Sequence, residues 1–213
     1  MRIRPVLLLF ALAGLAAGRL PADLFDELFA KAAPIDASMK TVRARFVETT
    51  TSALLKEPLV ARGTLSAERP ARLRLDYDVP EKRTLIVDER QLVMDWPSRG
   101  EHTVRDITQV QERVKKYFTA RDPAQLRSHF DITAVVDSAL TGTWRIEMVP
   151  RRKQIREGLS GLQIWIDQRT FFMRQMKMDF ASGESKTFAL EDVQLNAPLP
   201  QGVFETGPVP PSR

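Results

Sequence analysis

Residues 72–78 read Arg72-Leu73-Arg74-Leu75-Asp76-Tyr77-Asp78, so apolar and charged side chains alternate at every step. Residues 59–66 show the same period of two. Successive side chains of a strand point to opposite faces of a sheet, so this alternation is typical of strands with one buried and one solvated face. The stretch therefore predicts a sheet that is apolar on one side only.

The same period recurs along most of the chain. From Val42 onward it indicates strands separated by turn-forming pairs such as Pro80-Glu81 and Ser182-Gly183. Further strands are predicted at 84–88, 91–96, 143–149, 161–167, 171–180 and 186–193, with a short one near 203–204. We expect about nine or ten strands arranged as a meander of neighbours.

Three helices interrupt this pattern. The first is amphipathic, with Leu20, Leu24 and Leu28 on one face, Pro21 at its start and Pro34 near its end. Apolar residues at helical spacing predict a second helix over 107–118. A third begins at Asp122-Pro123, a helix cap followed by proline at the first helical position.

The width of such a sheet constrains the architecture. About ten strands at ~4.8 Å spacing span roughly 45 Å, whereas a helix is only ~10–12 Å across. Three helices cannot cover that apolar face, so the sheet must curl on itself. The pattern leaves open whether the concave side is a filled core or an apolar cavity, which would be a ligand site.

The N-terminus has the layout of a secretory signal peptide. Arg2 and Arg4 precede an apolar run from Val6 to Ala17, and small residues follow up to Gly18. The run is too short to span a bilayer as a helix, and no cysteine follows it that could carry a lipid. We expect cleavage near Gly18 and a chain that is free in the periplasm.

Residues 19–213 suit one domain, with a tail of about 205–213 rich in proline and glycine. We expect the segment from residue 196 onward to be loosely attached. The chain has no cysteine, so its stability comes from a core and not from disulfides. The formal charge of +5 falls to +3 without residues 1–18, and most charges alternate along strands, which argues against a nucleic-acid partner.

Residues that carry chemistry are sparse. His102 and His129 lie far apart in sequence, in contexts that look like loops, and Ser160 lacks the strand-to-helix context of a nucleophile elbow. Asp76 and Asp78 share a strand face with arginines and form a solvated charge ladder. We therefore expect no enzyme, no metal and no cofactor, and the apolar strand residues become the candidate site. Methionine is the adaptable filler of such surfaces, although core packing explains any single residue equally well.

Several segments together resemble the outer-membrane lipoprotein carrier family, known as LolA-like. In the first half these are Phe46-Val47-Glu48, Gly63-Thr64-Leu65, residues 69–77 with Pro80, and residues 92–97. In the second half residues 162–167, the 178–186 hairpin and residues 196–204 are similar to the family's closing strands and its ending. The resemblance covers essentially the whole mature chain.

The resemblance implies a mainly β (α+β) fold, an incomplete or half-open antiparallel β-barrel whose N-terminal helix and short lid helices enclose an apolar cavity. It implies a periplasmic chaperone that shields the acyl chains of lipoproteins during transfer from the inner to the outer membrane. Its partners would be lipoprotein or lipid cargo, an inner-membrane releasing complex and an outer-membrane acceptor, and we expect a monomer. An arginine at the position of Arg69 would bond to the lid in the empty state. The residues expected to contact lipid are Phe46, Leu65, Leu73, Leu75, Tyr77, Leu92, Met94, Trp96, Val110, Val114, Trp144, Met148, Met176 and Met178.

Two features depart from the family pattern. Leu73 and Leu75 stand where the family usually has aromatic residues, and the segment 52–59 is typical of a divergent branch. These departures leave open a different amphiphile as cargo, such as a glycolipid or a polyene–lipid conjugate in a dedicated pathway. An envelope interaction or sensing module of half-barrel fold is the alternative from another functional class.

Overall fold

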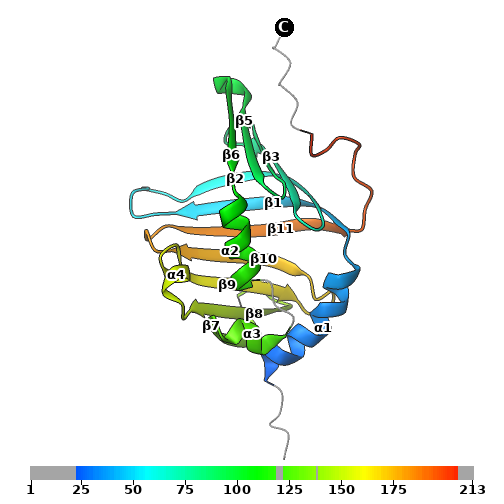
Figure 1. The fold of residues 1–213 in the computed structure, drawn as a ribbon, viewed down its shortest axis with the longest axis vertical. Coiled ribbons are helices and arrows are strands. Elements are labelled where there is room, and N and C mark those ends of the chain that lie inside the picture. The colour runs from blue at the N-terminus through cyan, green and yellow to red at the C-terminus, as the bar shows by residue number, and fades with distance from the viewer. Residues whose placement is uncertain (1–22, 119–121, 138, 206–213) are drawn as a thin grey trace, which may run out of the picture.

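The computed structural model describes residues 23–118, 122–137 and 139–205. In these residues eleven antiparallel strands form a single sheet in the order β6-β5-β4-β3-β2-β1-β11-β10-β9-β8-β7 (Figure 1). The strands of the first half are β1 (Thr41–Thr51), β2 (Leu59–Glu68), β3 (Arg72–Val79), β4 (Arg83–Val87), β5 (Gln91–Trp96) and β6 (Glu101–Asp106). Those of the second half are β7 (Phe130–Asp137), β8 (Thr143–Pro150), β9 (Leu159–Asp167), β10 (Met173–Phe180) and β11 (Ser185–Leu195). The helices are α1 (Leu24–Ser38), η1 (Pro97–Arg99), α2 (Thr108–Phe118), α3 (Pro123–Arg127) and α4 (Lys153–Arg156).

The sheet is built from two meanders that meet at its centre. β1 pairs with β2 on one side and with β11 on the other, so the first and last strands of the chain are neighbours. β6 and β7 are the two edges of the sheet, and the α2–α3 connection leads from one edge to the other. Figure 1 shows α2 crossing in front of the central strands between them. The predicted half-open antiparallel fold is therefore confirmed.

The amphipathic N-terminal helix is confirmed with later bounds. The Asp23 side chain caps α1 by accepting a hydrogen bond from the backbone N–H of Asp26 at 3.1 Å. The helix runs past Pro34 to Ser38, and Leu20 and Pro21 lie outside the described residues. Arg127 of α3 bonds to Asp23 at 2.5 Å, which ties α3 to the start of α1.

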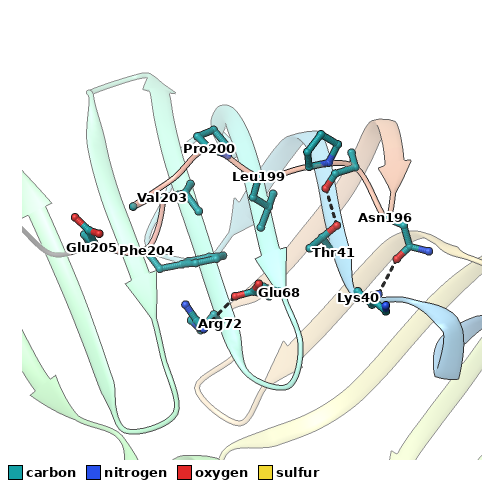
Figure 2. A pocket seen from close by; sticks show the side chains of 13 residues that line it. Lys40, Thr41, Glu68, Arg72, Asn196, Leu199, Pro200, Val203, Phe204 and Glu205 are labelled. Carbon is teal, nitrogen blue, oxygen red and sulfur yellow. Dashed lines mark hydrogen bonds and ion pairs between the residues drawn. The ribbon is translucent and has the colours of Figure 1, made fainter.

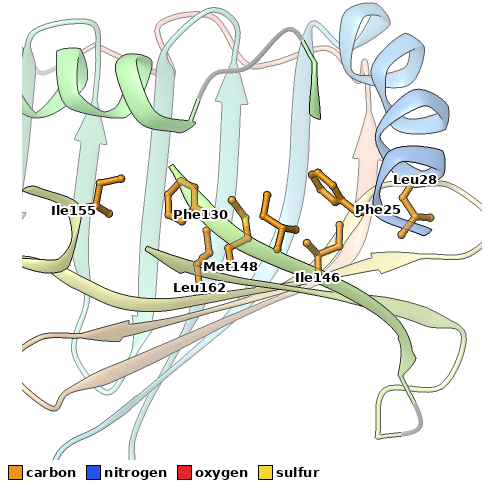
Figure 3. Packing of buried hydrophobic residues seen from close by; sticks show 8 residues of the cluster. Phe25, Leu28, Phe130, Ile146, Met148, Ile155 and Leu162 are labelled. Atoms are coloured by element: carbon orange, nitrogen blue, oxygen red, sulfur yellow. The ribbon is translucent and has the colours of Figure 1, made fainter. Parts of the chain in front are cut away.

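One hydrophobic core lies between these helices and the second half of the sheet. Phe25 and Leu28 of α1 and Ile155 of α4 pack against buried residues of β7, β8 and β9, including Phe130 and Met148 (Figure 3). A second core lies under the first half, where Phe46 of β1 is stacked on Phe188 and edge-on to Tyr77. Both cores lie on the same face of the sheet, since Phe188 of β11 is directly opposite Met176 of β10.

Two strands were not predicted, and one predicted strand is absent. β6 is polar and mostly exposed, so an edge strand there lacks the apolar alternation of the others. β7 does alternate, but it begins three residues after α3 ends, and the helical signal obscured it. Residues 201–204 form turns, so the strand predicted near Val203 and Phe204 is wrong.

The prediction that the chain is loosely attached from residue 196 onward is wrong for residues 196–205. The Asn196 side chain accepts a hydrogen bond from the backbone N–H of Lys40 at 2.7 Å. Thr41 donates to the carbonyl of Ala197 at 2.7 Å, and Arg74 donates to that of Val203 at 3.0 Å. These bonds hold the segment against β1 and β3, and residues 206–213 lie outside the described part of the chain.

Gly63 marks the closest approach between two strands. A Cβ atom at this position would lie 1.9 Å from the carbonyl oxygen of Asp76 in β3. We expect Gly63→Ala to lower the free energy of unfolding by about 1–3 kcal/mol or more, because the backbone must shift to admit the methyl group. Chemical denaturation of the purified variant measures this.

Gly161→Ala is the matched control. Gly161 also lies in a strand, but its added Cβ would come no closer than 3.4 Å to the side chain of Asp179. Its stability should change by less than about 1 kcal/mol, since the contact is ordinary and alanine restricts the unfolded chain. Equal losses in the two variants would contradict the packing argument.

Candidate functional site

The helix-bearing side of the sheet, called the inner face below, carries the candidate site. The strand register places one row of it across Ala134, Ile146, Ile164, Met176 and Phe188. Every strand residue proposed from the sequence to contact lipid lies on this face. They are Phe46, Leu65, Leu73, Leu75, Tyr77, Leu92, Met94, Trp96, Trp144, Met148, Met176 and Met178.

These side chains differ in how far they are covered. Phe46, Leu75, Tyr77 and Met148 are buried and already packed among their neighbours. The others are half-buried, including Met94 and Met176 within their strands and Trp96 at the end of β5. The inner face therefore presents an apolar band that the helices of the described residues leave partly open.

Helix α2 spans the inner face with little packing of its own. None of its residues is buried, and Val110 and Val114 are 57% and 44% exposed. Only its C-terminal end meets the core, where Phe118 lies 5.2 Å from Phe130 between ring centroids. An amphipathic helix with an exposed apolar side can be displaced at small energetic cost.

Arg69 lies in the turn between β2 and β3. Its guanidinium group forms an ion pair with Asp36, near the C-terminal end of α1, and its backbone N–H donates to Lys40 at 2.9 Å. Both side chains of the pair are well exposed, at 45% and 60%. The arginine proposed to bond to a lid thus contacts the N-terminal helix and not α2.

A polar group interrupts the apolar band. The Tyr77 hydroxyl donates to Glu48 at 2.6 Å, and the ammonium group of Lys186 lies 3.5 Å from the other carboxylate oxygen. The guanidinium of Arg83 lies over the Tyr77 ring, 3.9 Å from its centroid. Burial, reinforced by the hydrogen bond to Glu48, raises the pKa of the Tyr77 hydroxyl well above its usual value.

The polar residues considered for catalysis do not form a catalytic arrangement. His102 lies on the edge strand β6 and not in a loop, half exposed and paired with Asp95. Ser160 donates its hydroxyl hydrogen to the carbonyl of Asp179, so it faces no base. Within residues 23–118, 122–137 and 139–205, no three histidine, cysteine or carboxylate side chains group as metal ligands. The same residues contain no helix that is long and apolar enough to cross a membrane.

A pocket of about 420 Å³ lies away from the inner face (Figure 2). The segment 196–205 forms one wall, with Leu199, Val203 and Phe204, and Lys40, Glu68 and Arg72 form the other. Arg72 pairs with Glu68 at 3.2 Å and also faces the Phe204 ring. Because one wall carries these three charged side chains, the pocket is a less suitable site for an apolar ligand than the inner face.

Sequence reasoning missed several residues of the band. Ile164 and Ile166 of β9 pack with the first core, and Phe188 of β11 packs with the second. Apolar residues alternate along β9 and β11, which could have indicated these positions. Only the pairing register shows which alternate set of side chains faces inward. Glu48, Arg83 and Lys186 were also missed, because a charged residue in a strand is usually on the solvated face.

Comparison with known sequences gives two consistent findings. A family model described as "Outer membrane lipoprotein carrier protein LolA" matches residues 37–206. A protein of Methylibium petroleiphilum named outer-membrane lipoprotein carrier protein is 26% identical over 199 residues, covering 93% of this chain and 91% of that protein.

Solved structures with a similar fold are much more distant in sequence. The lipoprotein LppX of Mycobacterium tuberculosis has a TM-score of 0.52 and 12% identity, covering 82% of this chain and 96% of that one. A chain of the Pseudomonas aeruginosa MucA/MucB complex has a TM-score of 0.52 and 17% identity, covering 85% of this chain and 60% of that one. At these identities the similarity shows the fold alone.

Tyr77→Phe tests the polar group. The change removes the hydrogen bond to Glu48, a largely buried carboxylate with a side chain 12% exposed. We expect the free energy of unfolding at neutral pH to fall by about 1–3 kcal/mol in urea denaturation.

The same variant should change the pH dependence of stability. Because the pKa of Tyr77 is raised in the folded state, the unfolded chain loses this proton first, and stability present below pH ~10 is lost as the pH rises further. Tyr77→Phe should reduce this alkaline loss. Tyr117→Phe is the control, since the Tyr117 ring packs on His129 and its hydroxyl bonds to no described residue. Equal alkaline slopes for wild type and Tyr77→Phe would contradict the interpretation.

Proposed function

This chain belongs to the LolA family of outer membrane lipoprotein carrier proteins, as its sequence predicted, and on that premise we propose that it is a periplasmic carrier. It shields the acyl chains of lipoproteins, or of a related lipid, between the inner and the outer membrane. The apolar band of the inner face, half-buried beneath a loosely packed α2, is the observation that carries the proposal.

A carrier of this kind answers a physical requirement. Each methylene group exposed to water costs ~0.8 kcal/mol, so two or three long acyl chains carry a penalty of tens of kcal/mol. A face lined by half-buried methionine, tryptophan and leucine side chains replaces that water and adapts to chains of different shape. The family's role as carriers and the absence of a catalytic arrangement in the described residues both support a protein that binds without transforming its ligand.

Access to the inner face would be governed by its helices. The Val110 and Val114 side chains of α2 would join the band in contacting lipid, since they are exposed on the helix that crosses it. The ion pair between Arg69 and Asp36 would hold α1 in the empty state. An exposed ion pair contributes only about 0–1 kcal/mol, so cargo can break it at small cost.

The remaining parts of the proposal follow from the family. The signal peptide proposed for residues 1–18 lies outside the described residues, and export to the periplasm would follow its cleavage. An inner-membrane complex would load the cargo and an outer-membrane acceptor would take it. We expect the carrier to act as a monomer.

Arg69→Leu should increase lipid occupancy. Loss of the pair with Asp36 removes a bond that favours the empty state, so protein purified from the periplasm should retain about two- to fivefold more lipid or lipoprotein. Native mass spectrometry with lipid extraction measures this ratio.

Arg45→Leu is the matched control for this experiment. Arg45 is also exposed and paired, with Glu191 at 3.3 Å and Asp192 at 2.8 Å, but it lies on the outer face of β1. Its lipid occupancy should equal that of wild type. Wild-type protein that is free of lipid and refuses added lipoprotein would favour the alternative, an envelope module that docks to another protein.

Met176→Asn separates these two functions. A polar amide in the apolar band should reduce uptake of lipoprotein at least about fivefold, because desolvating it opposes burial of the acyl chains. Lys177→Asn, one residue along β10 and on the outer face, should leave uptake unchanged. Unchanged uptake in Met176→Asn would exclude the inner face as the binding surface.

A further inference from the structure

Arg83 is a cation on the inner face, in a row of the sheet that also carries Tyr77, Trp96 and Glu101. It is directly opposite Tyr77 in the pairing of β3 and β4, which fixes its side. Its guanidinium lies 3.9 Å from the centroid of the Tyr77 ring and 5.9 Å from that of Trp96. Leu75, Leu85 and Met94 form the adjacent row of the sheet.

This guanidinium forms no ion pair with a carboxylate of the described residues, although its charge acts on Glu81 at longer range. Glu48 is already bonded to Tyr77 and Lys186. Glu81, whose pKa is lowered mainly by its hydrogen bond to Arg99, also accepts a hydrogen bond from Ser98. Arg83 thus keeps a full charge against two aromatic rings, and its guanidinium also interacts with the Tyr77 hydroxyl.

Covering the inner face with a ligand would desolvate the Arg83 guanidinium. Acyl chains laid over the band would remove water from a half-buried guanidinium, and an unpaired charge is costly to desolvate. An anionic group on the same ligand would offset that cost, because Arg binds carboxylate and phosphate through two parallel hydrogen bonds. Lys186 lies on the same face but is paired with Glu48, so Arg83 is the cation available to such a group.

We propose that Arg83 binds the phosphate or carboxylate of an anionic amphiphile whose acyl chains lie on the inner face. The proposal rests on the proposed carrier function and adds to it a head-group site, formed by Arg83 between Tyr77 and Trp96. The ligand class is then an acylated molecule with a negative charge close to its chains, and not a neutral acyl chain alone.

Isothermal titration calorimetry with three probes tests the site on the mature, lipid-free protein. Dodecyl phosphate and dodecanol share one alkyl chain and differ in the anion, and inorganic phosphate supplies the anion alone. Wild type should bind dodecyl phosphate at least about tenfold more tightly than dodecanol, and inorganic phosphate far more weakly than either.

Three variants locate the preference. Arg83→Gln should abolish the advantage of dodecyl phosphate over dodecanol, because it removes the charge that binds phosphate and the cost of desolvating that charge under dodecanol, and Arg83→Lys should keep part of the advantage. Arg62→Gln is the control, because Arg62 is an exposed arginine on the outer face of β2. If Arg83→Gln is as stable as wild type and still binds dodecyl phosphate more tightly than dodecanol by the same factor, the proposal is overturned.

The probes also separate this proposal from the carrier function beneath it. Equal affinity of wild type for dodecyl phosphate and dodecanol overturns the head-group site and leaves the carrier intact. Failure to bind either alkyl probe or any lipoprotein overturns both. Inorganic phosphate that binds as tightly as dodecyl phosphate shows a free-anion site and overturns the proposal for an amphiphile.

Discussion

The structure depends on a sheet whose apolar face is wider than its helices can cover. Eleven strands lie in one sheet, and its edge strands β6 and β7 do not pair with each other. The core under α1 and α4 is buried, whereas the band toward β3, β4 and β5 stays half-buried. Covering this band with a third layer would have made a filled domain; leaving it open makes a surface that requires a ligand or a movable cover.

The connection between the two edges is what makes such a cover available. β6 ends on one edge and β7 begins on the other, so the chain must cross the open side once, and α2 makes most of that crossing. The α2 helix buries none of its residues, and its last residues Tyr117 and Phe118 anchor it to the first core. Topology therefore places a weakly held helix over the apolar band without any additional domain.

Sequence reasoning reached much of this fold because the physical signal was strong in particular segments. The alternation in residues 72–78 located β3 and the side of Leu73, Leu75 and Tyr77, and the register confirms that all three face inward. The sequence did not predict β6, because an edge strand needs no apolar side. It also did not predict that residues 196–205 are held in place, because their composition is typical of a loop and the hydrogen bonds that hold them come from Lys40, Thr41 and Arg74. It failed for Arg83 because the alternation of a single strand cannot show that a charged side chain stacks on a ring of the next strand.

In the proposed carrier, the balance of energies on the inner face would suit transfer better than storage. Acyl burial would supply tens of kcal/mol at ~0.8 kcal/mol per methylene, while the exposed pair of Arg69 and Asp36 would oppose opening by only about 0–1 kcal/mol. Closure alone would therefore not expel a cargo, and release would require an acceptor that buries the same chains equally well. A charged group such as Arg83 lowers the affinity for purely apolar ligands, because part of its hydration is lost on binding. The charge of Arg83 and the weak ion pair would thus have the same effect. Both would limit the affinity of the carrier for its ligand, so that an acceptor with a higher affinity could take the ligand.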